Sequence, residues 1–328
     1  LMLLRSLGRT FMSAAASSSP TAPAVATLAS GDRVTFREYG DENGYPVLFM
    51  HGNLNSREFQ PSWEKTQAQT VEAGAHVYAL DRPGYGGSSF SWDSRSYTNW
   101  AKTVNEFAKA KNLSSFAIVG YSSGGPHALA CSIGTVENVS SLALVAGDGP
   151  YAHLNKIWSC DILSEAYHLD KSKGETTMTK ELALARCETN VAQMKSDYAH
   201  IKKENRKEIA MRDIDTAIEQ GFDGPASDAV LECQDWGFEP SQVCVPTFLW
   251  HGEADESVPC KIATEYFMKT IPADMLKGAT IIETENHTII RRKWQSILEA
   301  VVQEGREASA RAGKRKRGDD ADATGTKL

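Results

Sequence analysis

Short apolar runs alternate with longer segments of helical periodicity through most of the chain. The apolar runs predict strands at residues 47–50, 76–80, 116–119, 142–146, 247–250 and 280–282. The segments between them predict helices at residues 63–73, 97–111 and 124–133, from about residue 260, and through residues 294–298. Near-continuous apolar strands separated by helices are typical of a mostly parallel sheet that is covered on both faces. We therefore predict an α/β fold with one central sheet.

The alternation of strands and helices breaks between residues 151 and 236. This stretch is rich in Lys, Glu, Ala and Met and contains few strand-like runs. It predicts several helices inserted into the fold. We expect residues 151–236 to form a helical cap on a core made of residues 31–150 and 237–305. Such a cap would control entry to a site beneath it.

The two ends of the chain differ from this core in composition. Residues 1–30 contain two arginines, many Ser and Ala, and no acidic residue. They predict either a disordered leader or an amphipathic segment that targets a mitochondrion or plastid. Residues 306–328 are poor in apolar side chains, so we predict a disordered charged tail, with a nuclear address as the alternative for their basic run. The chain begins with Leu1 rather than Met, which leaves its natural start open.

Composition narrows the class of protein further. The chain has 328 residues, of which 41% are hydrophobic and 23% charged, as in ordinary globular proteins. Its net charge of -7 argues against a general affinity for nucleic acid. Its apolar runs are too short for a bilayer span, so we expect no stable membrane insertion. The six cysteines form no C-x-x-C pair and predict buried reduced thiols in a cytoplasmic protein, unless the N-terminal segment directs it to an organelle.

The sharpest local signal is Gly120-Tyr121-Ser122-Ser123-Gly124, which follows a predicted strand and opens a predicted helix. This context is that of a nucleophile elbow, a tight turn that exposes a serine at the sheet edge. The turn closes only if the residues two before and two after the serine are small. Tyr121 excludes Ser123 on this criterion, whereas glycines flank Ser122 on both sides. Ser122 is therefore the candidate nucleophile.

A serine hydroxyl is a weak nucleophile and needs a base that is itself held by an acid. Asp255 follows one of the later predicted strands, and His287 follows the next strand along the chain. The carboxyl ends of parallel strands meet at one sheet edge, so we expect both residues near Ser122. His287 would take the serine proton and return it to the leaving group, while Asp255 would orient the imidazole. Asp148, which follows an earlier strand, is the alternative acid.

Acyl transfer also requires N–H donors for the oxyanion that forms on the substrate. The backbone N–H of Ser123, at the start of the helix after the elbow, is one candidate. The N–H of Asn53, in the loop His51-Gly52-Asn53 after an early strand, is the other. The Asp81-Arg82 pair is expected to stabilise a turn instead.

The order of these motifs resembles the α/β-hydrolase superfamily, within its group of serine enzymes that carry a cap after the sixth strand. The matching blocks are residues 51–53, 81–88, 120–125, 251–255 and 286–287, and the resemblance extends from about residue 34 to residue 305. It implies a triad of Ser122, Asp255 and His287 that works without a cofactor or a metal. One departure is Asn286, since many relatives have glycine before the catalytic histidine.

The resemblance implies a carboxylesterase- or lipase-like serine hydrolase that cleaves an ester or similar acyl bond of a small molecule through an acyl-enzyme. Two alternatives stay open: an aminopeptidase similar to proline iminopeptidases, and a ligand receptor that keeps the fold without turnover. The serine nucleophile argues against epoxide hydrolases and haloalkane dehalogenases, which use aspartate. The identity of the substrate and the oligomeric state are not predicted.

Overall fold

The computed structural model describes residues 22–158 and 177–323, and eight strands within them form one sheet. The strands are β1 Ala24–Thr27, β2 Arg33–Gly40, β3 Tyr45–Met50, β4 Ala75–Leu80, β5 Phe116–Tyr121, β6 Val139–Val145, β7 Thr247–Gly252 and β8 Leu276–Ile282. Their order in the sheet is β1-β2-β4-β3-β5-β6-β7-β8. β2 pairs antiparallel with β1 and β4, and the other neighbours pair in parallel. The predicted fold class, a mostly parallel central sheet, is confirmed.

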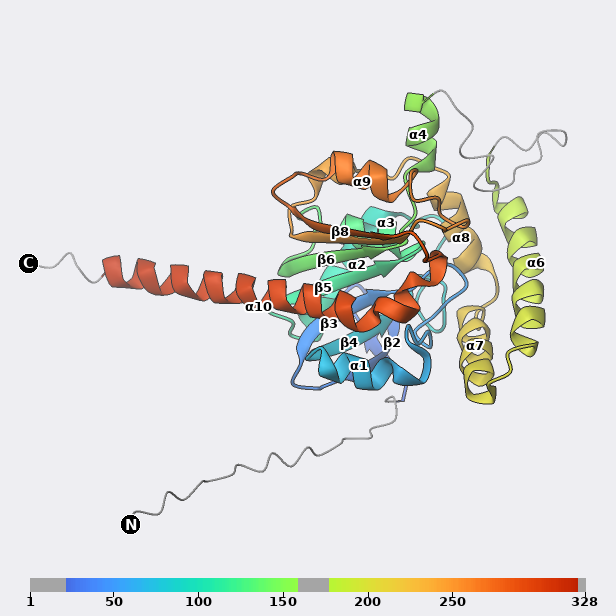
Figure 1. The fold of residues 1–328 in the computed structure, drawn as a ribbon, viewed down its shortest axis with the longest axis horizontal. Helices are drawn as coiled ribbons and strands as arrows, with labels where there is room; N and C mark the ends of the chain where they lie inside the picture. The colour runs from blue at the N-terminus through green and yellow to red at the C-terminus, as the bar shows by residue number, and fades with distance from the viewer. Residues whose placement is uncertain (1–21, 159–176, 324–328) are drawn as a thin grey trace, which may run out of the picture.

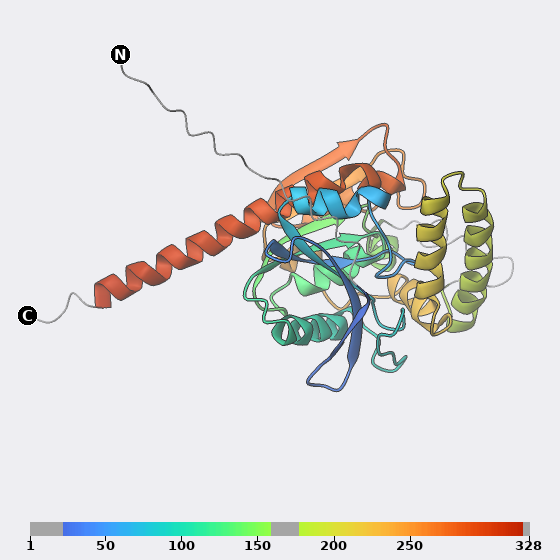
Figure 2. The same ribbon diagram turned by 90° about the horizontal axis from the view of Figure 1, so that it is seen from below.

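Helices cover both faces of this sheet, as Figures 1 and 2 show. The helices are α1 Thr66–Glu72, α2 Tyr97–Ala110, α3 Gly124–Cys131, α4 Tyr151–Trp158, α6 Lys180–Ala199, α7 Glu204–Ala217, α8 Asp223–Glu232, α9 Thr264–Thr270 and α10 Ile290–Ala323. Short 3₁₀ helices occur at Trp63–Lys65, Pro240–Gln242 and His287–Ile289. Helices α1 and α10 pack on one face, and α2, α3 and α9 pack on the other.

The sheet separates two buried apolar layers, and strand β3 shows how the chain fills both. Phe49 points to the α10 side, where its ring meets the edge of Trp294 at 5.4 Å between centroids. Met50 points to the opposite side, where its sulfur lies 3.4 Å from the indole nitrogen of Trp100 in α2. Successive side chains of a strand face opposite ways, so an uninterrupted apolar run is needed when both faces are covered.

Helices α6, α7 and α8 follow one another between β6 and β7 and stand beside the core as the predicted helical cap (Figure 1). Residues 159–176, which also belong to the expected cap, lie outside the described residues. Helix α6 begins at Thr179, whose side chain accepts a hydrogen bond from the N–H of Leu182 and so caps the first turn. Helix α8 leads from the cap back to the core. Its residues Ala229 and Glu232 line the same pocket as Ser122.

The structure corrects both expected ends of the core. Strand β1 lies inside residues 1–30, which we expected to be a leader, because its backbone pairs with β2 at the edge of the sheet. Helix α10 continues through Ala323, although we expected disorder from residue 306. Arg, Lys, Glu and Ala are good helix formers, so a helix anchored in the core can extend past its buried part (Figure 2). Residues 1–21 and 324–328 lie outside the described residues.

The prediction of buried cysteines holds for most of those that the structure describes. Cys131, Cys187, Cys233 and Cys260 are buried as predicted, whereas Cys244 is exposed; Cys160 lies outside the described residues. Within residues 22–158 and 177–323, no helix is both long and apolar enough to cross a bilayer.

Candidate active site

Ser122 occupies a strained turn between β5 and α3. Its φ of 52° lies in the left-handed region that non-glycine residues rarely adopt. The turn is fixed by hydrogen bonds from Ser122 N to Val145 O at 3.0 Å and from Gly125 N to Ser122 O at 2.7 Å. A Cβ added to Gly120 would lie 2.6 Å from the carbonyl oxygen of Gly124. The elbow geometry predicted from the glycine spacing is therefore present.

The Gly120→Ala variant is expected to lose about 1–3 kcal/mol of unfolding free energy, because the new methyl group overlaps the backbone of the elbow. Gly278→Ala is the matched control: its added Cβ would meet only Phe248 Cδ1, at an ordinary 3.7 Å. Urea denaturation of both variants measures the difference. Equal stability of the two variants would show that the elbow does not require glycine at position 120.

The structure brings Ser122, His287 and Asp255 into one hydrogen-bonded chain. The Nε2 atom of His287 lies 3.0 Å from Ser122 Oγ, and its Nδ1 atom lies 2.8 Å from Asp255 Oδ2. An ionised carboxylate only accepts hydrogen bonds, so Nδ1 must carry the proton of a neutral ring. Nε2 is then left with a lone pair that faces the serine hydroxyl. An arrangement of this kind can deprotonate a serine as it attacks a carbonyl carbon.

Asp255 is buried and surrounded by donors. Its Oδ1 accepts the backbone N–H groups of Ser257 and Val258, both at 2.9 Å. Burial alone would raise the pKa of this carboxyl, but the hydrogen bonds from His251 and His287 outweigh burial and hold the pKa below its usual value. Asp255 is therefore ionised at neutral pH, as a partner of an imidazolium must be.

His251 contributes to this environment in a way that sequence reasoning missed. Its Nε2 lies 3.1 Å from Asp255 Oδ2 and 2.8 Å from the carbonyl oxygen of Val258. Both partners only accept, so Nε2 carries a proton, and Nδ1 faces the hydroxyl of Thr264 at 2.7 Å. The spacing of four residues between His251 and Asp255 was the available signal.

Asp148, the alternative acid, lines a pocket together with Ser122 and His287 but does not contact the imidazole nitrogens of His287. Its Oδ1 accepts the phenolic hydrogen of Tyr151 at 2.9 Å. Burial raises the pKa of this carboxyl, against the lowering effect of the bond from Tyr151. The geometry thus pairs His287 with Asp255 and leaves Asp148 as a buried acid beside the site.

The departure at Asn286 has a local explanation. The residue has φ -113°, a conformation open to any amino acid, so glycine is not required there. Its side-chain oxygen accepts hydrogen bonds from the N–H and hydroxyl of Thr288 at 3.0 and 2.8 Å. Asn286 therefore caps the short helix that begins with His287, and the ring stays within reach of Ser122.

Asn53 and Ser123, the candidate oxyanion donors, both line the pocket beside Ser122. Gly52 packs closely against the nucleophile, since an added Cβ there would lie 3.0 Å from Ser122 Cβ. Within the described part of the chain, the backbone N–H groups of Asn53 and Ser123 donate no hydrogen bond. Both N–H groups thus stay candidates for binding an oxyanion.

The pocket above Ser122 has a volume of about 500 Å³ and lies between the sheet edge and the cap. Core residues such as Leu54 and Val258 form one wall, and Ala183, Cys187 and Ala229 of the cap form another. This size suits a small organic molecule. Among the described residues, no three His, Cys, Asp or Glu side chains group closely enough to hold a metal ion.

Asp81 and Arg82, which we expected to stabilise a turn, are buried in separate ion pairs and do not line this pocket. Asp81 contacts Arg57, and Arg82 Nη1 lies 2.7 Å from Asp228 of cap helix α8. Arg95 pairs with the same aspartate. Breaking a buried pair leaves an uncompensated charge, so these contacts hold α8 on the core. This role of Asp228 was not predicted from the sequence.

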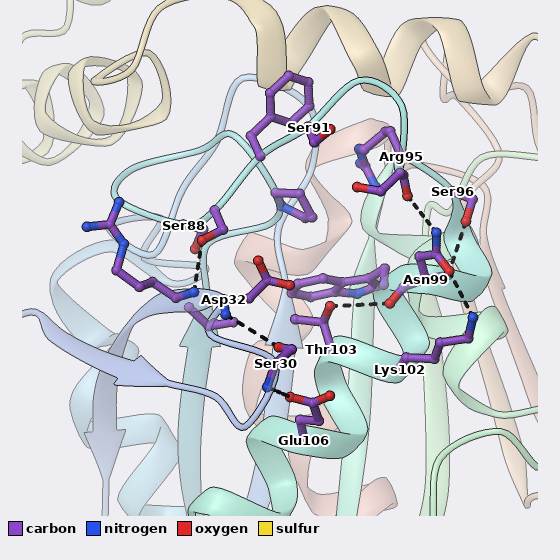
Figure 3. Close-up of a pocket in the computed structure, with 17 residues that line it drawn as sticks. Ser30, Asp32, Ser88, Ser91, Arg95, Ser96, Asn99, Lys102, Thr103 and Glu106 are labelled. Atoms are coloured by element: carbon purple, nitrogen blue, oxygen red, sulfur yellow. Dashed lines mark hydrogen bonds between the residues drawn. The ribbon is translucent and has the colours of Figure 1, made fainter.

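A second pocket, of about 290 Å³, shares no lining residue with the first. Figure 3 shows it surrounded by serine hydroxyls and by the first turns of α2. Its polar groups bind one another: Ser30 N donates to Glu106 at 2.9 Å, and Lys102 Nζ donates to Asn99 Oδ1 at 3.0 Å. No histidine or cysteine is among its lining residues.

Known proteins support the fold and the broad class. Lipase 1 from Psychrobacter immobilis is 33% identical over 126 residues, which cover 38% of each chain. A non-heme chloroperoxidase from Kitasatospora aureofaciens is 29% identical over 102 residues, 31% of this chain and 35% of that protein. The matching stretches thus span little more than a third of these relatives.

The structural likeness is more extensive. An esterase from Exiguobacterium antarcticum superposes with a TM-score of 0.62 at 20% identity, over 85% of this chain and 98% of the esterase. At that identity the likeness shows the fold alone. The profile of the alpha/beta hydrolase fold matches residues 45–277, which is most of the chain. The protein therefore belongs to the alpha/beta hydrolase fold family.

Proposed function

We propose that this hydrolase-family protein cleaves an ester or similar acyl bond of a small molecule, with Ser122 as nucleophile. The observation that carries the proposal is the 3.0 Å distance between Ser122 Oγ and His287 Nε2, on a histidine whose other nitrogen faces Asp255. The lipase and the esterase among the similar proteins point to the same reaction class.

The reaction follows from these contacts. Ser122 Oγ attacks the acyl carbon while its proton passes to His287 Nε2, and the carbonyl electron pair moves to the oxygen. The N–H groups of Asn53 and Ser123 stabilise that oxyanion. When the carbonyl re-forms, the bond to the leaving group breaks, and His287 delivers its proton to the departing atom. Water then attacks the acyl-enzyme with His287 again acting as base, which releases the acid and free Ser122.

One feature of the pocket favours the aminopeptidase alternative. Asp148 and Glu232 are both buried and both line the pocket, so it carries two acidic groups beside the basic residue Arg186. A substrate with a free amine would be attracted to such groups. The choice between ester and aminoacyl substrates is therefore part of the test.

A fluorophosphonate probe is expected to label the wild-type protein and not the Ser122→Ala variant, because the probe reacts only with an activated serine. The same two proteins are assayed on nitrophenyl esters of graded acyl length and on aminoacyl nitroanilides. Turnover of the esters supports the proposal, and turnover of the anilides alone favours the aminopeptidase. Ser196→Ala serves as the control for labelling, since Ser196 is exposed on α6 and does not line the pocket.

Absent labelling of the wild type, or equal labelling of Ser122→Ala, would contradict the proposal. The receptor alternative has its own signature: ligands of the panel would raise the melting temperature of the wild type without being hydrolysed.

A further inference from the structure

The loop of residues 52–56 follows strand β3 and contains Asn53, whose backbone N–H is a candidate oxyanion donor. It turns sharply at Leu54, whose φ of 56° lies in the left-handed region. A hydrogen bond from Asn55 N to Gly52 O at 3.2 Å closes the turn. A strained turn keeps its shape only if its surroundings hold it. The direction of the Asn53 N–H therefore depends on which residues of other elements bind this loop.

The cap binds this loop through Asp213 of helix α7. Asp213 Oδ1 accepts the backbone N–H of Ser56 at 2.8 Å, and Oδ2 accepts the side-chain amide of Asn55 at 2.8 Å. The hydroxyl of Ser56 lies 2.9 Å from Oδ1 and 3.0 Å from the main-chain oxygen of Asp213. Asp213 is buried, with 4% of its surface exposed. Both oxygens of one carboxylate thus bind consecutive residues of the loop.

Cap helix α8 touches the same loop at a second point. The side-chain amide of Asn53 donates to the carbonyl oxygen of Pro225 at 3.4 Å, and its oxygen accepts the hydroxyl of Tyr85 at 3.3 Å. These are longer and neutral contacts, which are weaker than hydrogen bonds to an ionised carboxylate. Asp213 therefore supplies the stronger of the two attachments.

We propose that Asp213 is a positioning residue of the hydrolase: by binding Asn55 and Ser56 it holds the loop that aims the Asn53 N–H at the oxyanion. The inference rests on the proposed function. Helix α7 of the cap then helps to form the oxyanion site. It does so through Asp213, which lies 157 residues from Ser56 in the chain.

The ionised form of Asp213 is the one that fits these contacts. Each carboxylate oxygen already faces an N–H donor, so a proton on either oxygen would displace a hydrogen bond to the loop. Burial raises the pKa of Asp213 to about 7, although the bonds from Asn55 and Ser56 lower it. Loop attachment is thus expected to weaken as the pH falls through neutrality.

Other ionisable groups face Asp213 from the elements packed around it. Arg291 of α10 lowers the pKa of Asp213, while Tyr39 of β2 and Tyr198 of α6 have their own pKa values raised by burial and by the charge of Asp213. The two phenols stay neutral near pH 7, and an arginine stays charged. Asp213 is the member of this group that changes charge near neutral pH.

The test replaces Asp213 by Asn, which keeps its shape but presents an NH₂ group to one of the loop donors. We expect kcat to fall about 10–100-fold with KM nearly unchanged, because the oxyanion is stabilised only in the transition state. Asp215→Asn is the matched control: this aspartate is on the same helix, is 56% exposed and pairs with Lys195 at 2.5 Å. Asn55→Ala removes one loop contact from the other side and is expected to act like Asp213→Asn.

A pH series separates positioning from a general loss of structure. The ratio of wild-type to Asp213→Asn kcat/KM is expected to rise as the pH passes through about 7, because only the wild type ionises at this position. Contributions from His287 are common to both proteins and cancel. A flat ratio, or an equal loss in Asp215→Asn, would overturn the inference.

Hydrogen exchange supplies a readout that does not depend on turnover. The amides of Asn55 and Ser56, which donate to Gly52 O and Asp213 Oδ1, are expected to exchange faster in Asp213→Asn than in the wild type at pH 8, with unchanged exchange in the sheet. Unchanged exchange in the loop would overturn the inference whatever the activity. If the wild type neither labels nor hydrolyses, the proposed function fails, and the exchange comparison alone decides whether Asp213 holds the loop.

Discussion

Replacement of His287 by alanine is expected to lower kcat on an activated ester by about 10⁵–10⁶-fold, because losing the base of such a triad costs nearly as much as losing the whole triad. The reason is specific to the geometry of Ser122. Its hydroxyl lies 3.0 Å from His287 Nε2, and the residue follows directly on the buried strand β5. With the imidazole gone, the serine proton has no positioned acceptor when the attack occurs.

Steady-state turnover and the rate of fluorophosphonate labelling both measure this effect. His200→Ala is the control, since His200 is exposed and, among the described residues, its side chain bonds only to Ser196 O of the preceding helix, at 2.8 Å. That variant is expected to keep wild-type kcat. Residual activity of His287→Ala within about tenfold of the wild type would mean that another group acts as base.

The elbow and the triad geometry could be predicted from the sequence because each depends on local rules. Gly120 and Gly124 are required by contacts within one turn, so their spacing alone selects Ser122 over Ser123. Asp255 and His287 follow strands, and parallel strands deliver whatever follows them to one edge. The catalytic roles of these residues stay proposals that the variants above test.

The contacts of the cap could not be predicted in the same way. Helix α7 contains Asp213 and Asp215, two residues of the same type on one turn. One is buried against the loop of residues 52–56, and the other is exposed and paired with Lys195. The apolar spacing of Ile209, Ala210, Ile214 and Ala217 places Asp213 on the buried face of α7 and Asp215 on the other. It does not reveal what Asp213 contacts, because that depends on packing between segments about 150 residues apart.

The same limit explains the errors at the ends. Strand β1 has only four residues, none of them fully buried, and is defined by its pairing with β2. Edge strands lack the continuous apolar run that marks a central strand. The extension of α10 depends on its buried anchor around Trp294 and Leu298, which nucleates a helix that the polar residues beyond then continue.

The Asp255→Asn variant is expected to lower kcat by about 10⁴-fold while leaving the fold intact. In the wild type, Asp255 Oδ1 accepts two backbone N–H groups and Oδ2 accepts His287 Nδ1–H. An asparagine would keep its oxygen toward the backbone donors and turn its NH₂ group toward His287. The ring would then accept at Nδ1 and carry its proton on Nε2, which is the wrong tautomer to deprotonate Ser122.

Comparison with Asp148→Asn decides between the two candidate acids. Asp148 is buried in the same pocket, but its carboxylate accepts from Tyr151 and not from His287, so we expect kcat to change by less than about tenfold. Both variants are measured for kcat over a range of pH and for thermal stability. A loss confined to Asp148→Asn would assign the acid to the earlier strand. A loss confined to Asp255→Asn would follow from the tautomer that Asp255 imposes on His287, since Asp148 makes no hydrogen bond to that imidazole.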